Sequence, residues 1–150
     1  MTRLAILGAL WLLASPALAA DAEALNGRCL EQLQFEGDYL LPRFPKLSIA
    51  YRRSGERQYF FLVEPVGPGT DCGRIAGHVI VSSLPLRSKP KDAWYGVNFD
   101  CRNSSGVKPG DTLIVLFKGN GSGLSLDAWK IDARRRLFVK TESVECYSFT

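Results

Sequence analysis

The chain contains 150 residues, of which 46% are hydrophobic and 23% are charged, and its formal net charge is +4. This length and apolar content predict one domain of ordinary size with a buried core. The small positive excess is spread along the sequence, which argues against a nucleic-acid-binding protein.

The first 19 residues have the pattern of a secretory signal peptide. Arg3 precedes an unbroken apolar run over residues 4–14, and the small residues Ala17 and Ala19 stand ahead of the expected cleavage site. The apolar run is shorter than the roughly 20 residues that a membrane-spanning helix needs. We therefore expect this leader to be removed and residues 20–150 to form a single domain.

The remainder of the sequence predicts a soluble, exported protein. The first cysteine, Cys29, lies well beyond the cleavage region, so we expect no lipid attachment there. No later apolar run approaches membrane-spanning length. The Ala-rich leader is bacterial in style, which predicts a periplasmic or secreted protein, and loss of Arg3 leaves a small net positive charge.

The segment after the leader, residues 21–33, favours a short N-terminal helix. Its apolar residues would share one helical face: Leu25, Cys29, Leu30 and Leu33. Gly27 costs about 1 kcal/mol relative to Ala within a helix, which predicts that the helix is short or broken.

Beyond this segment the pattern changes to β. Alternation over residues 47–51, a turn around Gly55 and the apolar run 58–64 predict a hairpin. Further strands are expected over residues 74–84, 93–101, 112–118, 124–132, 137–141 and 143–149. About eight or nine short strands separated by turn signals predict a mostly β fold, either an antiparallel sandwich or a barrel.

Three of these strands have features that predict their place in the sheet. The run 112–118 is almost wholly apolar, which indicates a central strand buried on both faces. The strand 124–132 has polar ends around Trp129 and is typical of an edge strand. Gly96, inside the strand 93–101, suggests a bulge or a close approach to the backbone.

Four cysteines in an exported chain predict two disulfides: Cys29, Cys72, Cys101 and Cys146. Their wide spacing lacks the close pairs found in zinc and redox sites, so we expect no metal and no other cofactor. Three pairings are possible. We prefer Cys72–Cys101, which would close a loop around one predicted hairpin, with Cys29–Cys146, which would tie the N-terminal segment to the last strand.

His78 is the single histidine of the chain and a weak candidate for catalysis. A hydrolytic triad would need a nucleophile and a carboxylate beside it, which Ser82 or Ser83 and Asp100 would supply if the strands that carry them pair. No serine stands in a G-x-S-x-G motif. An isolated histidine in a strand more often has a packing or surface role.

Asp127 and Asp132 form a second weak candidate, because they flank Trp129 and paired carboxylates hydrolyse glycosides. The simpler interpretation is that they are the polar ends of a strand. The glycine-containing loops 106–112 and 119–123 match neither a phosphate loop nor a dinucleotide motif, since no helix follows them. Two glycosylation sequons, at Asn103 and Asn120, are relevant only in a eukaryotic secretory pathway and indicate exposed loops.

Three basic clusters fall at predicted turns: Arg52–Arg53, then Arg87, Lys89 and Lys91, then Arg134, Arg135 and Arg136. Such residues are mostly solvated turn tips. If two clusters converge at one end of the fold, they would form a patch for anionic sugars, lipopolysaccharide or lipid headgroups.

These observations predict a small exported binding domain that contacts anionic envelope components through its basic loops. They favour a binding protein over an enzyme. One alternative is a hydrolase of envelope carbohydrate or peptide, centred on His78 or on Asp127 and Asp132. The other is a structural envelope protein or an inhibitor of a secreted enzyme. The sequence gives no indication of the oligomeric state.

Overall fold

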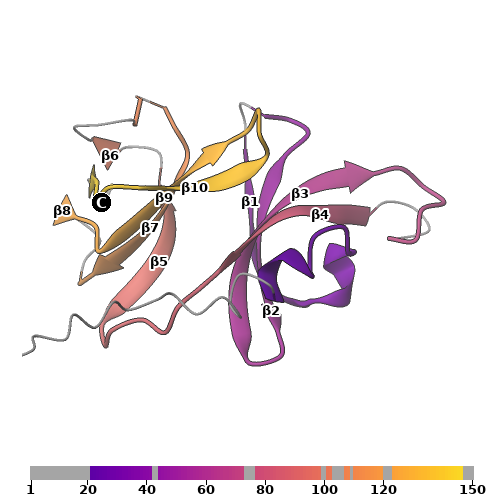
Figure 1. The fold of residues 1–150 in the computed structure, drawn as a ribbon, viewed down its shortest axis with the longest axis horizontal. Helices are drawn as coiled ribbons and strands as arrows, with labels where there is room; N and C mark the ends of the chain where they lie inside the picture. The colour runs from indigo at the N-terminus through magenta and orange to yellow at the C-terminus, as the bar shows by residue number, and fades with distance from the viewer. Residues whose placement is uncertain are drawn as a thin grey trace, which may run out of the picture.

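The computed structural model describes residues 21–41, 44–72, 77–98, 101–102, 107–108, 110–119 and 123–146. Within these ranges the chain is mostly β, with antiparallel pairing in each sheet, as the sequence predicts (Figure 1). The predicted leader, the triad candidate Asp100 and both sequons lie outside the described residues. No helix in the described part of the chain is long and apolar enough to cross a membrane.

The first sheet has the strand order β1-β2-β3-β4. Its strands are β1 (Gln34–Leu40), β2 (Ser48–Ser54), β3 (Arg57–Val66) and β4 (Gly77–Pro85). The predicted hairpin is confirmed as β2 and β3, and its turn contains Gly55 at a φ of 62°, a conformation that favours glycine. The sequence did not predict β1, because its polar and acidic residues give no clear alternation.

The second sheet has the order β10-β9-β7-β5, and a small third sheet has the order β6-β11-β8. The second contains β5 (Ala93–Asn98), β7 (Leu113–Lys118), β9 (Asp127–Asp132) and β10 (Leu137–Thr141). The third contains β6 (Cys101–Arg102), β8 (Gly123–Leu124) and β11 (Glu145–Cys146). The strands expected over 93–101 and 124–132 are therefore each divided between two sheets.

The prediction that β9 is an edge strand is wrong, since β9 lies between β7 and β10. Its polar ends have another cause. Asp127 forms an ion pair with Lys140 of β10, and Asp132 accepts a hydrogen bond from the Arg135 backbone N–H at 3.0 Å in the following turn. The two acids thus fix the β9–β10 hairpin and do not mark an open edge.

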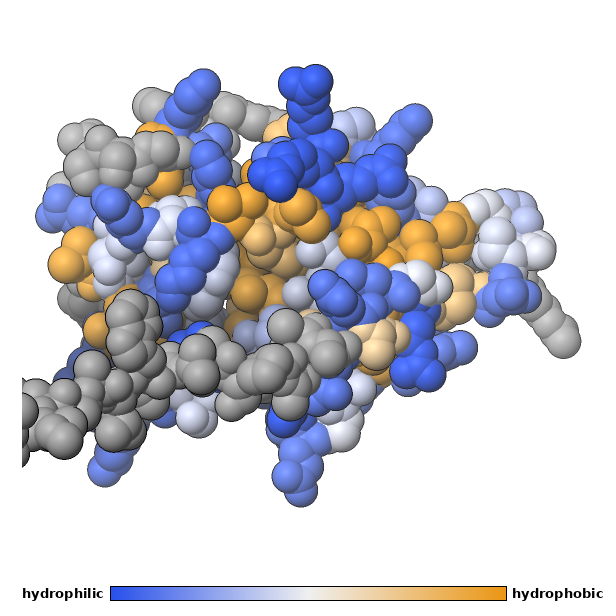
Figure 2. All heavy atoms as spheres, viewed as in Figure 1, coloured by the Kyte–Doolittle hydropathy of each residue, from blue (hydrophilic) through white to orange (hydrophobic). Residues whose placement is uncertain are grey.

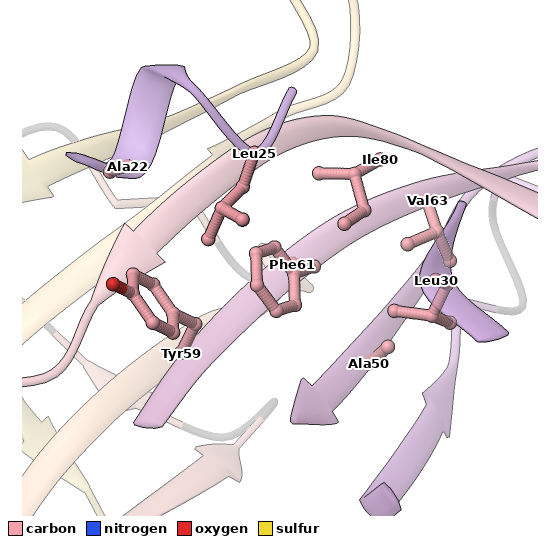
Figure 3. Close-up of a cluster of buried hydrophobic side chains, with 8 residues drawn as sticks. All are labelled: Ala22, Leu25, Leu30, Ala50, Tyr59, Phe61, Val63 and Ile80. Carbon is pink, nitrogen blue, oxygen red and sulfur yellow. The ribbon is translucent and has the colours of Figure 1, made fainter. Parts of the chain in front are cut away.

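Three apolar cores lie between the layers of the fold. The two four-stranded sheets enclose one core, which includes Ile49, Phe60, Leu62, Ile114 and Trp129. Figure 3 shows a second, in which the N-terminal segment covers the opposite face of the first sheet; it contains Ala22, Leu25, Leu30, Ala50, Tyr59, Phe61, Val63 and Ile80. The third lies between the second and third sheets and contains Cys101, Leu113, Val115, Phe117, Ala128, Val144 and Cys146.

The central strands β3 and β7 contribute to two cores each. Successive residues of β3 alternate between the inter-sheet core and the N-terminal core, so Phe60 and Phe61 are both fully buried on opposite faces. In β7, Ile114 faces the first sheet while Val115 faces the third. The prediction of a strand at 112–118 that is buried on both faces is confirmed.

The N-terminal segment is a broken helix, as Gly27 predicts. Residues 21–23 are helical, Gly27 takes a φ of 82°, and a 3-10 turn, η1 (Leu30–Gln32), follows. Between them residues 24–27 form a turn, after which Cys29 is extended and forms an isolated antiparallel bridge with Val79 of β4. This bridge holds the segment against the outer edge of the first sheet.

Two disulfides are present, but the preferred pairing is wrong. Cys29 bonds to Cys72, with Cα atoms 5.0 Å apart, and Cys101 bonds to Cys146, with Cα atoms 4.0 Å apart. The bridge between Cys29 and Val79 places the N-terminal segment beside the loop before β4, which carries Cys72. Cys101 and Cys146 face each other across the β6–β11 ladder. Strand pairing, which the sequence did not predict, decides both partners.

The close approach expected at Gly96 is confirmed. A Cβ atom at this position would lie 2.6 Å from the Trp94 ring. That ring packs on Phe117 with centroids 5.6 Å apart, and its indole N–H donates to the Gly119 carbonyl at 3.0 Å. Gly96 therefore leaves room for a tryptophan that ties β5 to the end of β7.

Candidate functional site

A groove of about 910 Å³ opens where β4, an edge strand of the first sheet, lies beside β10, an edge strand of the second. Its lining comes from four places: Ala22, Glu23 and Asn26; Glu56, Arg57 and Gln58; residues 82–88; and Trp129, Leu137, Phe138 and Lys140. Figure 2 shows apolar side chains around a hollow in the middle of this face, with hydrophilic side chains above them. Its volume is within the range of ligand pockets.

Apolar side chains at the groove continue into the core between the two main sheets. Leu84 of β4 and Trp129 of β9 belong to that core, and Phe138 of β10 packs against it. Polar contacts lie nearer the N-terminal segment, where the Ser83 hydroxyl donates to Asn26 Oδ1 at 2.7 Å. The groove thus combines an apolar base with a polar rim.

Two of the three cations that line the groove are neutralised within the protein. Arg57 forms an ion pair with Asp21 at 2.8 Å. Lys140 pairs with Asp127, and its ammonium lies 5.0 Å from the centroid of the Trp129 ring. The third, Arg87, is exposed and forms no ion pair with any residue that the structure describes.

Arg87 lies near the start of a basic loop, residues 86–92, that connects β4 to β5. Lys89 and Lys91 of this loop are exposed as well. The Gly119 N–H donates to the Asp92 carbonyl at 3.0 Å, which brings the exposed Lys118 beside the loop. Burial raises the pKa of Tyr95, although a hydrogen bond with the Arg87 backbone opposes the rise. That bond fixes the start of the loop against β5.

The other exposed basic cluster lies elsewhere. Arg134, Arg135 and Arg136 occupy the turn between β9 and β10, and Arg136 pairs with Glu64 at 3.2 Å near the end of β3. Leu86, next to Arg87, donates to the carbonyl of Gln58 near the start of β3. Glu64 lies six positions after Gln58 on the extended strand, or about 20 Å away. The two clusters therefore lie toward opposite ends of β3.

Arg52 and Arg53 are not turn tips, contrary to the prediction, because both lie within β2. Arg52 is 6% exposed, pairs with Asp38 at 2.7 Å and lies 4.5 Å from the centroid of the Phe35 ring. Arg53 pairs with Glu36 at 2.8 Å. The strand β1, which supplies both acids, was not predicted, so the sequence could not reveal these pairs.

His78 has different neighbours from those that a triad requires. β4 pairs with β3, and β5 lies in the other sheet, so the condition for the triad is not met. His78 Nδ1 lies 3.0 Å from Glu31 Oε1. Ser82 and Ser83 are four and five residues further along β4, at distances of about 13–16 Å.

Asp127 and Asp132 are not brought together either. They lie five positions apart on β9, which places them on opposite faces and about 16 Å from each other. Paired glycosidase carboxylates are roughly 5–9.5 Å apart. No group of three or more His, Cys, Asp or Glu side chains within the described ranges is arranged to hold a metal ion.

The groove itself was missed by the sequence reasoning. Trp129 and Arg87 were noted separately, but nothing in their spacing joins them. Only the approach of two sheet edges does so. The chain matches no protein-family model, no curated protein sequence and no solved structure. Its function is therefore argued from these residues.

Proposed function

We propose that this protein is an exported binding domain that contacts anionic components of the cell envelope through the loop 86–92. The observation that carries the proposal is the cluster of cations at this loop that form no ion pair with the described residues. Arg87, Lys89 and Lys91 are exposed, and Lys118 lies beside them. A tip of this kind attracts phosphate or carboxylate groups on a surface.

Export is part of the proposal and rests on two features. The leader has the pattern of a secretory signal, and two disulfides close loops between residues that are 43 and 45 positions apart. Disulfides persist in oxidising compartments. Each would contribute about 4 kcal/mol of stability in the chain-entropy model, which suits a small exported domain.

Binding to defined anionic probes tests this function. The protein would be exported from its full sequence, purified in the oxidised form and sedimented with vesicles of phosphatidylglycerol or of phosphatidylcholine. Binding to alginate would be measured in parallel, which distinguishes lipid phosphate from polysaccharide carboxylate as the source of the anion. We expect the protein to bind an anionic probe, and we expect its affinity to fall as the salt concentration rises.

Two sets of substitutions locate the contact. Each cation near an anionic surface contributes about 1 kcal/mol, so Arg87→Gln, Lys89→Gln and Lys91→Gln together should weaken binding roughly 100-fold. The control, Arg134→Gln with Arg135→Gln, removes two exposed cations at the far end of β3 and should have a small effect. Binding that is insensitive to salt, or lowered equally by both sets, would reject the proposal.

A further inference from the structure

We propose that the groove between β4 and β10 binds an extended peptide segment of a partner protein, which adds as a strand to the open part of the β4 edge. The inference goes beyond the anionic contact of the loop, because it assigns a second ligand class and a second set of binding groups. Strand addition to a free sheet edge is a common mode of peptide recognition.

The first half of the β4 edge is already partnered by the chain's own N-terminal stretch, at the isolated bridge between Cys29 and Val79. The Ile80 N–H donates to the Arg28 carbonyl at 3.0 Å, and the Gly27 N–H donates to the Ile80 carbonyl at 2.7 Å. At the next outward position, the His78 N–H donates to Glu31 Oε1 at 2.9 Å. The outward backbone groups of Ile80 are therefore satisfied by backbone pairing, and the His78 N–H is satisfied by a side-chain carboxylate.

The second half of the same edge continues into the groove. Leu86 donates its N–H to the carbonyl of Gln58 in β3. Because backbone groups alternate in direction along a strand, those of Leu84 also point to β3, whereas those of Ser83 and Pro85 point away from it. The irregularity in the β3–β4 register between Leu62 and Val63 accounts for the change of parity after Ile80.

Ser83 and Pro85 present open hydrogen-bonding groups to the groove. No other backbone group in the described part of the chain bonds to their outward side. Pro85 has no N–H, so the edge offers the Ser83 N–H and the carbonyls of Ser83 and Pro85. The N-terminal segment turns away at Asn26, whose side chain accepts the Ser83 hydroxyl. The groove thus begins where the internal strand addition stops.

The opposite wall is also a strand edge. The Ile131 N–H donates to the carbonyl of Thr112, just before β7. The backbone groups of the odd-numbered residues of β9 therefore point to β7, and those of the even-numbered residues point to β10. In the β9–β10 register, Lys130 opposes Val139. Phe138 and Lys140 therefore direct their backbone groups to the outer side of β10. Both residues line the groove, which places two open strand edges around one space.

The side chains of the groove define the peptide chemistry. Leu84, Trp129 and Phe138 favour apolar side chains at alternate positions of the peptide. Arg87, which has no ion-pair partner among the residues described, favours an acidic residue at one end. The N-terminal segment runs antiparallel to β4, so a peptide that continues its course would place this acid toward its own N-terminus. Glu23 and Glu56 line the groove as well and disfavour a second acid there.

Selection from a display library of random linear peptides tests the inference. The oxidised, exported protein is the bait, and enriched peptides are synthesised and titrated by calorimetry. We expect sequences with alternating apolar residues and an acid near the N-terminus. Ser83→Pro removes the open N–H and should weaken binding roughly tenfold. Because this variant risks misfolding, methylation of alternate backbone nitrogens in the peptide provides the same test on intact protein.

The other edge of the first sheet supplies the matched control. Leu40→Glu on β1, where the side chain is 78% exposed, should leave peptide binding unchanged. Failure to enrich any peptide would overturn the inference, as would peptides that bind equally well after N-methylation and to Ser83→Pro. Ser83→Pro should retain binding to the anionic probe. If the wild-type protein binds the anionic probe but no peptide, this inference alone has failed; if it binds a peptide but no anionic probe, the proposed function alone has failed.

Discussion

Two basic clusters of this protein look alike in the sequence and have opposite roles in the structure. Arg52 and Arg53 lie in β2, where acids on the neighbouring β1 neutralise both. Arg87, Lys89 and Lys91 lie in a connecting loop and face solvent. The first pair holds an edge strand in place, whereas the second set forms no ion pair among the described residues. Whether a run of cations is a binding patch thus depends on what the adjacent strand provides.

The largest effect is expected from Arg52→Ala. This change leaves Asp38 without its partner and removes hydrogen bonds to the carbonyls of Gly37 and Tyr51, at 2.8 and 2.9 Å. Since Asp38 is half exposed, the loss should be about 2–3 kcal/mol, below that of a fully buried pair. Urea denaturation measures it. A loss within 0.5 kcal/mol would mean that β1 does not depend on this arginine.

Glu36→Gln should cost about 1–2 kcal/mol at neutral pH. Burial would raise the pKa of Glu36, but hydrogen bonds from Arg53 and Gln58 and the charge of Arg53 outweigh it, so the pKa is lowered below 4.5. The contribution of this carboxylate is present above its unfolded pKa and is lost as the pH falls through the folded one. Denaturation midpoints at acidic pH should therefore decline less steeply in the variant than in the wild type.

Tyr51→Phe should cost about 0.5–1.5 kcal/mol, because it removes a hydrogen bond to Glu36. Burial and the neighbouring Glu36 raise the pKa of Tyr51 to about 12. The unfolded chain ionises this phenol near pH 10, so stability is lost as the pH rises between the two values. Absorbance titration of the phenolate would detect the raised pKa, and the variant should lack this alkaline component.

The smallest effect is expected in the loop. Lys89→Ala and Lys91→Ala should each change the free energy of unfolding by less than about 0.5 kcal/mol, because both side chains are exposed. The same urea titration used for Arg52 measures this. A cost comparable to that of Arg52→Ala would show that the loop cations are structural and would remove the contrast between the two clusters.

Several features follow from the order of residues alone. Alternation and glycine placement predicted the β2–β3 hairpin, the buried strand β7, the break at Gly27 and the close approach at Gly96. These depend on local geometry, since side chains of a strand alternate between faces and glycine tolerates conformations that other residues avoid. The sequence also predicted a mostly β fold, from its alternating short runs, and two disulfides, from four cysteines that follow a predicted secretory leader.

The remaining features depend on which strands pair, and only the tertiary structure decided that. The disulfide partners, the interior place of β9 and the neutralisation of Arg52 and Arg53 all arise from contacts between distant segments. The groove has the same origin, since β4 and β10 belong to different sheets and meet only when these pack. Local pattern determines the face of a strand that is buried, whereas the neighbour of each edge is set by packing between layers.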